Sequence, residues 1–454
     1  MQNEVDHEGA LPDFQDNDHW LARLFYHTFE GKIYYTSSRG WMIFDGKRFT
    51  DDPGGTIVGK MGEFLEFESY RSIERNDDKA VQRYLNLAQS DKKIKSALNL
   101  SKYYFFDDGN NWDADPTLFN CNNGTINLAT GKLQPHDWRD KITRVSPIDY
   151  LGENAPRENV EKFLNELFKD PEMISMIRRF IGYCLTGLTN EDAIFFLYGT
   201  GLNGKSTLCN LLVETMGDYA VVARIETFLT AHRGASNHSG DLARLAGARF
   251  VVAGEPGPRT KIDESIIKSM CGGDKVTARF AYGREFTFDQ TFKIALYFNN
   301  APEIEGADDG TWRRIYPITF PNKFTRNDTF KLALKKELSG FLYLAVIGAK
   351  EWLNSRLGTP PQVTEDADNY RRISDPFGTF IEEECDINDE YMDSSSTLFG
   401  CYDQWAKKNN EEDMSHKQFA MTLKERGFQI KHRREGNYFF GISKKSASYL
   451  QKCD

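Results

Sequence analysis

The stretch that most constrains the fold is FFLYGTGLNGKSTLCNLL, residues 195–212. An apolar run typical of a buried strand stops at Gly199, and a glycine-containing turn follows. Lys205 then opens a segment with helical character that ends at Gly217. Residues 199–206 fit the pattern GxxxxGK[ST]. A strand, this loop and a helix in direct succession predict a phosphate-binding loop in an α/β fold.

The chemistry of such a loop assigns a role to each part of it. Backbone N–H groups converge on phosphate oxygens, and the N-terminus of the following helix adds positive potential. We expect Lys205 to reach the β and γ phosphates of a nucleoside triphosphate, and the Ser206 hydroxyl to bind Mg²⁺. The expected nucleotide contacts are Gly199, Thr200, Gly201, Leu202, Asn203, Gly204, Lys205, Ser206 and Thr207.

The segment GARFVVAGEP supplies the acidic residue that this chemistry needs. Phe250 to Ala253 predict a strand, and Glu255 follows it, where a carboxylate can hold Mg²⁺ or polarise the attacking water. Many enzymes with this loop carry Asp-Glu here, whereas this chain has Gly254-Glu255. One carboxylate then has to serve both tasks or reach the metal through water. Glu255 could instead cap a turn before Pro256.

Further polar residues follow in a fixed order. Lys268 precedes a glycine-rich turn, and residues 275–288 alternate like a β-hairpin. The strand FKIALYF then ends at Asn299, which could sense the γ phosphate and position water, or simply satisfy a turn. The hairpin tip consists of Tyr282, Gly283, Arg284 and Glu285.

Two adjacent arginines, Arg313 and Arg314, close this series in the segment DDGTWRRI. One of them could reach a nucleotide on an adjacent subunit as an arginine finger. Both could also be a solvated surface pair. The order of all these features within one α/β unit is more informative than any one of them.

Composition limits the classes of partner. The net charge of -10 means that any contact with nucleic acid has to come from local basic patches. The seven cysteines form no CxxC pair, which favours reduced thiols and no zinc site. The N-terminus lacks an apolar signal segment, and the longest apolar runs are too short to span a bilayer. We expect a cytoplasmic protein, in the host cell cytoplasm if it is encoded by a phage, without membrane association.

The chain divides into four predicted regions. Residues 1–155 predict an α+β module with two hairpin-like segments on either side of a helical one, and residues 156–190 predict a helical collar or oligomerisation segment. Residues 191–358 predict an α/β unit that closes with two helices broken near Gly340. The polar segment GTPPQVTEDAD predicts a linker. Residues 376–454 predict helix, helix and hairpin, the outline of a winged-helix domain.

The motifs quoted above, with IKSMCGGDKVTARFAYGREFTFDQTFK and ALYFNN, resemble a known family. The chain resembles superfamily 3 helicases of the AAA+ class, in the phage and plasmid primase-helicase branch related to the poxvirus one. GWMIFDGKRF and FNCNNGTINLATGKLQPHD resemble the module that precedes the motor in that branch. The similarity covers most of residues 20 to 450.

The resemblance implies an ATP-driven DNA helicase that forms a ring, typically a hexamer, and tracks along single-stranded DNA with 3′→5′ polarity. It implies that residues 191–358 are the AAA+ motor, with Glu255 as the catalytic acid and Asn299 as the sensor. Lys268 falls near the expected nucleotide site between subunits, and Arg313 or Arg314 is the finger. ATP and Mg²⁺ are the implied ligands.

The same resemblance places the hairpin tip in the pore. Tyr282, Gly283 and Arg284 replace the Lys-His pair that other branches of the superfamily carry there. An aromatic ring and a guanidinium still suit single-stranded DNA, through stacking and phosphate contact.

Two regions outside the motor bear on partners. FFDDGNNWDAD, at residues 105–115, is the one stretch with clustered acids that could serve priming, but its Gly and Asn content predicts a solvated loop. A separate primase or polymerase would then prime. The tail is rich in Lys and Arg, and Arg433 and Arg434 are predicted to bind DNA phosphates. A solvated basic face or a protein-docking site remains an alternative for this tail.

The function that follows is an ATP-dependent replicative DNA helicase that acts on single-stranded and forked DNA. The first alternative is an origin-binding initiator that uses ATP as a switch and does not unwind processively. A nucleotide kinase lacks support because no arginine-rich lid occurs, and a GTPase lacks support because no NKxD motif occurs. An AAA+ assembly factor that acts on protein is the third alternative.

Overall fold

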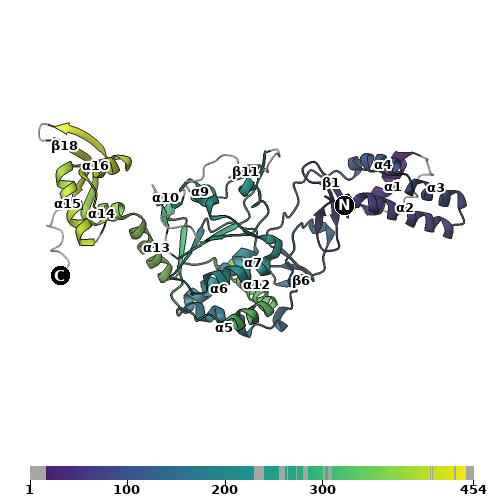
Figure 1. The fold of residues 1–454 in the computed structure, drawn as a ribbon, viewed down its shortest axis with the longest axis horizontal. Coiled ribbons are helices and arrows are strands. Elements are labelled where there is room, and N and C mark those ends of the chain that lie inside the picture. Colours follow the sequence, from purple (N-terminus) through teal and green to yellow (C-terminus); the bar gives the residue numbers. More distant parts are fainter. Residues whose placement is uncertain are drawn as a thin grey trace, which may run out of the picture.

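A computed structural model describes the chain in three successive parts, with helices α1–α4 at one end, a central sheet, and a C-terminal unit at the other end (Figure 1). The described residues are 17–229, 240–254, 261–262, 264–271, 273–279, 285–299, 302–304, 309–409, 411, 413–433 and 436–445. Within them, no helix is both long enough and apolar enough to cross a bilayer. The six cysteines of this part of the chain are buried and unpaired.

The N-terminal part combines four helices with a small antiparallel sheet. The helices are α1 (Asp18–Phe29), α2 (Thr56–Glu74), α3 (Asp78–Ala88) and α4 (Asp91–Tyr104), and the strands are β1 (Ile33–Thr36), β2 (Gly40–Phe44) and β3 (Phe49–Asp51). Its core contains edge-to-face contacts of Phe25 with Phe64 and Phe105. The first predicted hairpin and the helices predicted over residues 77–100 are confirmed.

A second antiparallel sheet joins this part to the centre. Its strands are β4 (Leu118–Cys121), β5 (Gly124–Asn127) and β6 (Lys132–Gln134), which confirms the second predicted hairpin. The Phe119 ring stacks on Tyr219, with 4.7 Å between the centroids. Arg48 and Asp218 form an ion pair across the same boundary. The ring contact joins the second sheet to the central part, and the ion pair joins the segment between β2 and β3 to it.

The centre is a five-stranded, fully parallel sheet with the order β15-β7-β13-β9-β8. Its strands are β7 (Ile194–Tyr198), β8 (Ala220–Val222), β9 (Phe250–Gly254), β13 (Lys293–Phe298) and β15 (Ile315–Thr319). Helices cover both faces, which explains why β7, β9 and β13 are almost continuously apolar. The prediction of an α/β unit is confirmed.

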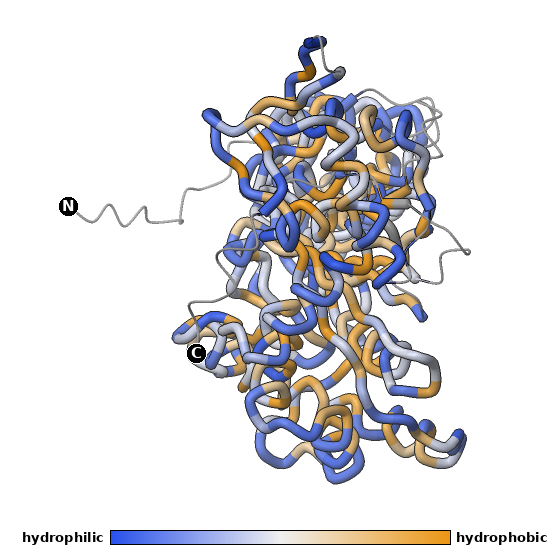
Figure 2. The backbone as a smooth tube through the Cα atoms, turned by 90° about the vertical axis from the view of Figure 1, so that its left-hand side faces the viewer, coloured by the Kyte–Doolittle hydropathy of each residue, from blue (hydrophilic) through white to orange (hydrophobic). Residues whose placement is uncertain are grey.

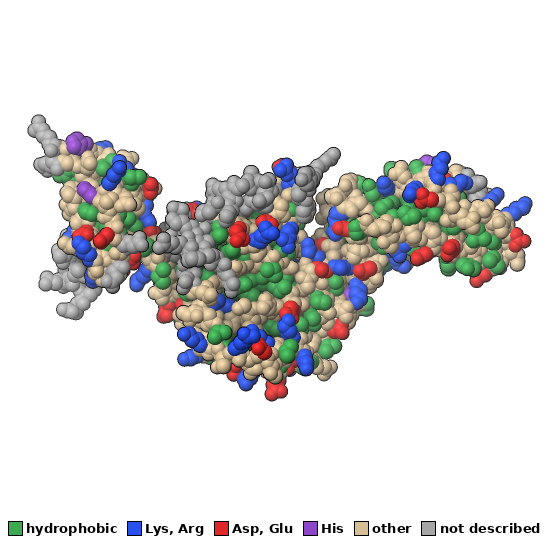
Figure 3. Space-filling view, viewed as in Figure 1, with side chains coloured by type: hydrophobic (Ala, Val, Ile, Leu, Met, Phe, Trp, Pro, Cys, Tyr) green, Lys and Arg blue, Asp and Glu red, His purple; other side chains and the backbone are tan. Residues whose placement is uncertain are grey.

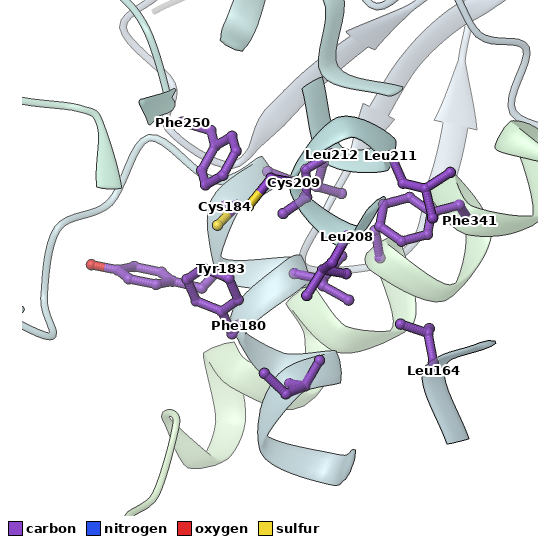
Figure 4. Packing of buried hydrophobic residues seen from close by; sticks show 14 of the residues in the cluster. Leu164, Phe180, Tyr183, Cys184, Leu208, Cys209, Leu211, Leu212, Phe250 and Phe341 are labelled. Atoms are coloured by element: carbon purple, nitrogen blue, oxygen red, sulfur yellow. The ribbon is translucent and has the colours of Figure 1, made fainter. Parts of the chain in front are cut away.

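One face of the sheet carries the main core. It packs against α5 (Glu158–Leu167), α6 (Pro171–Leu185), α7 (Lys205–Met216), α11 (Asp328–Lys336) and α12 (Leu338–Ser355). Figure 4 shows side chains of this core, among them Phe180 and Tyr183 of α6 and Leu208 and Leu212 of α7. Helices α5 and α6, predicted as a collar, therefore pack into the core of the sheet. In Figure 2, orange hydrophobic stretches alternate with blue turns throughout the body.

The other face carries a second core around α9 (Glu264–Ser269) and α10 (Asp309–Trp312). Two short pairs lie beyond it: the parallel strands β10 (Lys261–Ile262) and β14 (Glu303–Ile304), and the antiparallel strands β11 (Val276–Arg279) and β12 (Glu285–Phe288). The latter pair confirms the two strands of the hairpin predicted over residues 275–288. Short 3-10 helices are η1 (Trp138–Asp140), η2 (Gly152–Asn154), η3 (Gly217–Tyr219) and η4 (Ile225–Phe228).

One prediction about the segments after the sheet is wrong, and the predicted break between two helices is confirmed to within three residues. The predicted linker GTPPQVTEDAD forms most of α13 (Pro361–Ser374), because Pro361 suits the first turn of a helix and Asp366 accepts a hydrogen bond of 3.0 Å from the Thr319 N–H. The break between the last two helices lies at Glu337 rather than at Gly340. Gly340 lies inside α12, where a side chain would overlap the carbonyl oxygen of Pro156.

The C-terminal part has its own core. Its elements are α14 (Pro376–Glu384), β16 (Cys385–Ser394), α15 (Ser395–Asn409), α16 (His416–Glu425), β17 (Gln429–Arg433) and β18 (Gly436–Lys444). The sheet order is β16-β18-β17, and the core includes Phe380, Trp405, Phe419 and Phe439. The two predicted helices and the hairpin are confirmed, whereas α14 and β16 were not predicted.

Candidate nucleotide-binding site

The loop between β7 and α7 depends on backbone conformations that favour glycine. Gly199, Gly201 and Gly204 have φ angles of 152°, 89° and 90°. A Cβ at Gly204 would lie 2.6 Å from a methyl carbon of Leu167 and 3.3 Å from the Phe163 ring, both on α5. The glycines therefore let the loop lie directly against α5.

Lys205 lies within this loop. It is 3% exposed, and its Nζ donates to the carbonyl oxygen of Gly199 at 2.7 Å and to Oδ1 of Asn203 at 3.0 Å. Burial lowers the pKa of this lysine from its ordinary value. The Asn203 Nδ2 atom is buried without a hydrogen-bond partner. The positive charge of Lys205 and the unpaired Nδ2 donor of Asn203 both suit the phosphates of a nucleotide.

Ser206 and Thr207 lie in the first turn of α7. Helix N-termini leave backbone N–H groups unpaired, and α7 has no side-chain cap at its start. Ser206 is exposed, so its hydroxyl is open to a ligand at the loop. This hydroxyl fits the Mg²⁺ that accompanies a nucleoside triphosphate.

A cavity of about 420 Å³ adjoins the loop. Its apolar surface combines Leu202 of the loop with Phe163, Phe324, Phe330 and Leu334. The Phe324 N–H donates to the carbonyl oxygen of Leu202 at 2.7 Å, so the loop and the cavity wall are joined. Its rim carries polar and charged side chains, which are Lys162, Glu166, Thr325, Arg326, Asn327 and Lys331. Aromatic rings beside a phosphate-binding loop fit a nucleoside base.

The neighbouring strands bring two other predicted positions to the same edge of the sheet. Phe298 lies opposite Tyr198, so Asn299 follows β13 beside the start of the loop, and it is exposed. Strand β9 ends at Gly254, which lies opposite Tyr297 of β13. In parallel α/β sheets, ligands bind at this carboxyl edge.

Lys268 and the arginine pair lie at the opposite, amino edge. The carbonyl oxygen of Arg314 accepts a hydrogen bond of 2.8 Å from the N–H of Ile194, the first residue of β7. Lys268 forms an ion pair with Glu264 in α9, a helix that contacts α10. Five-residue strands separate the two edges by roughly 16 Å. The structure therefore does not bring these residues to the loop of the same chain.

The two arginines differ in their surroundings. Arg314 is partly buried and donates from Nη1 to the carbonyl oxygen of Gly310 at 2.6 Å. Arg313 is exposed. Arg313 is therefore the more accessible of the two side chains.

Several predicted residues lie outside the described part of the chain: Glu255, Tyr282, Gly283, Arg284 and Arg434. Arg433 is exposed at the end of β17, and its guanidinium lies 5.7 Å from the Tyr438 ring centroid and 5.6 Å from that of Phe440. On the face shown in Figure 3, basic and acidic side chains are interspersed rather than gathered into one band.

The acidic stretch at residues 105–115 is an ordered loop. Asp107 accepts hydrogen bonds from Lys141, the Trp112 ring and the Gly109 N–H. Burial by itself would raise the pKa of Asp107, but these hydrogen bonds outweigh burial and lower the pKa below its ordinary value. Across the described ranges, no three His, Cys, Asp or Glu side chains are grouped closely enough to hold a metal ion.

Sequence reasoning missed the aromatic wall and Tyr297. Phe324 and Phe330 lie 118 and 124 residues after Ser206, in a segment without a motif, and Tyr297 was assigned only to a strand. No local pattern could have found them, because their positions depend on which strands and helices are neighbours.

Two family models match the chain. Residues 22–169 match a family described as "D5 N terminal like", and residues 197–314 match a "Family of unknown function (DUF5906)". The second match begins near the end of β7 and ends at Arg314.

Curated viral proteins are similar to the chain. It is 29% identical over 294 residues to "Putative helicase L207/L206" of Acanthamoeba polyphaga mimivirus, a match that covers 60% of this chain and 31% of the relative. It is 27% identical over 223 residues to "Putative primase C962R" of African swine fever virus (strain Badajoz 1971 Vero-adapted), covering 47% of this chain and 23% of the relative. The chain therefore matches a third or less of the length of each.

A solved structure shares the fold. The structure titled "The A form apo structure of NrS-1 C terminal region-CTR" superposes with a TM-score of 0.52 at 9% identity, covering 95% of this chain and all of that one. At this identity the likeness concerns the fold alone. The family models and the curated proteins support a relationship between this chain and viral primase-helicase proteins.

Proposed function

We propose that the chain is an ATP-dependent DNA helicase of replication, and that it acts as a ring on single-stranded and forked DNA. The observation that carries the proposal is the loop at residues 199–206, which lies at the carboxyl edge of a parallel sheet with Lys205 buried inside it. Two similar viral proteins are named putative helicase and putative primase, which supports a role of this chain in nucleic-acid metabolism.

The described residues fit defined tasks at this site. The N–H groups of the loop and Lys205 bind the phosphates, and the aromatic wall of Phe324 and Phe330 holds the base. Mg²⁺, when bound, neutralises phosphate charge. Ser206 is placed to hold it. Asn299, which is exposed after β13, would orient the attacking water, and Glu255 would take a proton from that water.

The division of residues between two edges of the sheet supports an oligomer. Arg313 and Lys268 cannot serve the loop of their own chain from the amino edge. In a head-to-tail ring, the amino edge of one subunit faces the carboxyl edge of the next, and such interfaces close into rings. The arginine would then stabilise charge that develops on the phosphoryl group of its neighbour.

The C-terminal part supports DNA contact. Three helices and a sheet of order β16-β18-β17 support the proposal of a winged-helix domain, in which β17 and β18 would form the wing. Lys431 and Arg433 are exposed on that wing beside Tyr438 and Phe440. Cations of this kind bind phosphates, and exposed rings can stack on bases.

Strand displacement on a forked DNA tests the proposal. The wild-type chain should unwind the fork only with ATP and Mg²⁺. Lys205→Ala should lose at least a hundredfold in ATP hydrolysis and in unwinding, because the loop loses its only buried charge. Lys95→Ala, at an exposed lysine of α4, is the matched control and should act like the wild type.

Two outcomes would contradict this assignment. Full ATP hydrolysis by Lys205→Ala would refute the role of the loop. ATP-dependent binding of duplex DNA without displacement would instead favour an initiator that uses ATP as a switch.

A further inference from the structure

Gly254 has no side chain, and the ring of Tyr297 fills the space that a side chain at this position would occupy. In enzymes with a loop of this kind, a carboxylate at the end of the neighbouring strand holds Mg²⁺ together with the loop Ser or Thr. The residue directly before Glu255 in this chain is Gly254. A Cβ built on Gly254 would overlap the Cζ, Cε1 and Cε2 atoms of Tyr297. The outer end of the phenol ring therefore occupies the space of the missing side chain.

The strand register places Tyr297 near the carboxyl edge of the sheet, on the strand next to β7. Tyr297 lies opposite Gly254 on β9 and opposite Leu197 on β7, two residues before the loop begins. Its side chain is half-buried and packs on the main core, the face of the sheet that carries α7 and Ser206. The hydroxyl is bonded to Cζ, so it extends from the point where a side chain at position 254 would start.

We propose that Tyr297 is a positioning residue for the Mg²⁺–nucleotide complex, and that its hydroxyl substitutes for the carboxylate absent at position 254. This inference rests on the proposed function of the same site. A phenol is neutral at physiological pH and can both donate and accept a hydrogen bond. It can orient a hydrated cation without adding charge.

A purely steric role predicts a different result. If the ring only fills space beside Gly254, removal of the hydroxyl changes neither metal nor nucleotide binding. Tyr297→Phe keeps the ring and removes only the oxygen, so it separates the two roles without opening a cavity.

The test measures metal binding directly in the full chain. Mn²⁺ binding is followed by electron paramagnetic resonance in the presence of a non-hydrolysable ATP analogue, and binding of the analogue alone is measured in EDTA. In Tyr297→Phe we expect Mn²⁺ affinity to fall roughly ten- to a hundredfold, as for other residues that orient a metal site. Affinity for the analogue without metal should stay within about twofold.

Tyr316→Phe is the matched control. Tyr316 lies on the central sheet in β15, and its hydroxyl donates to the carbonyl oxygen of Gly358 at 2.5 Å. Its loss should leave Mn²⁺ affinity unchanged. Equal Mn²⁺ affinity in wild type and Tyr297→Phe would overturn the inference.

A reciprocal exchange gives a second readout. Gly254→Asp combined with Tyr297→Ala puts a carboxylate where the phenol was, and it should bind Mn²⁺ better than Tyr297→Ala alone. If the added carboxylate does not increase Mn²⁺ affinity, the phenol of Tyr297 does not occupy the position of a metal-binding side chain at residue 254. If the wild type binds neither the analogue nor Mn²⁺ with it, the proposed function itself fails, a result distinct from a defect confined to the metal.

Discussion

At the scale of single residues, the loop at residues 199–206 is unusual for its exposed leucine. Leu202 has a φ of 50° and is 69% exposed, although a left-handed conformation is disfavoured for residues with a Cβ. Its side chain lines the cavity together with the rings of Phe324 and Phe330. A base bound between these groups would cover the apolar surface that Leu202 now exposes.

Phe330→Ala should therefore weaken the binding of ATP but not of inorganic triphosphate. Loss of one stacking ring is expected to reduce ATP affinity roughly tenfold, since stacking contributes about 1–3 kcal/mol per base. Triphosphate contacts only the loop and should bind both variants equally in a calorimetric titration. Phe399→Ala, at a partly buried phenylalanine of the C-terminal part, is the control. Equal ATP affinity in Phe330→Ala and wild type would place the base elsewhere.

At the scale of elements, α6 and α12 are held together by backbone contact. A Cβ at Gly182 would overlap the backbone N of Ala349, and one at Gly348 would overlap the carbonyl oxygen of Arg178. The two helices can approach this closely only because both positions lack a side chain. Sequence periodicity predicted both helices, but it could not predict their crossing point, because that point depends on a residue of the other helix.

Gly348→Ala should consequently destabilise the chain although alanine favours helices. Overpacking at such a contact costs about 1–3 kcal/mol, more than the roughly 1 kcal/mol gained in helix propensity. Gly59→Ala in α2, where a Cβ meets no atom within 4 Å, is the matched control and should stabilise slightly. Chemical denaturation measures both free energies of unfolding. A Gly348→Ala variant as stable as Gly59→Ala would show that the helices can separate without cost.

At the scale of the whole molecule, the central sheet separates two sets of residues. The loop and Asn299 lie at its carboxyl edge, whereas Lys268 and Arg313 lie at its amino edge. Within a single chain, the two sets of residues therefore lie at opposite edges of the sheet. This arrangement requires a second copy if both sets act on one nucleotide.

Mixing two inactive variants tests this requirement. Lys205→Ala and Arg313→Ala should each lack DNA-stimulated ATP hydrolysis, but an equal mixture should recover roughly a quarter of it. The reason is that one interface in four pairs an intact loop with an intact arginine in a head-to-tail ring. Mixing Lys205→Ala with a Lys205→Ala/Arg313→Ala double variant is the control and should recover nothing. No recovery in the first mixture would rule out a shared site.

The sequence by itself determined the contiguous features: the strand, loop and helix around Lys205, the apolar strands of the α/β unit, and the two helices and hairpin of the tail. These follow from local periodicity and glycine placement, which act over a few residues. Only the tertiary structure decided the strand order, the opposite edges of the arginines and the loop, and the place of the Tyr297 ring above Gly254. It also showed that much of the predicted linker is helical and belongs to α13. Each of these depends on contacts between residues far apart in the chain, whose free energy no local pattern records.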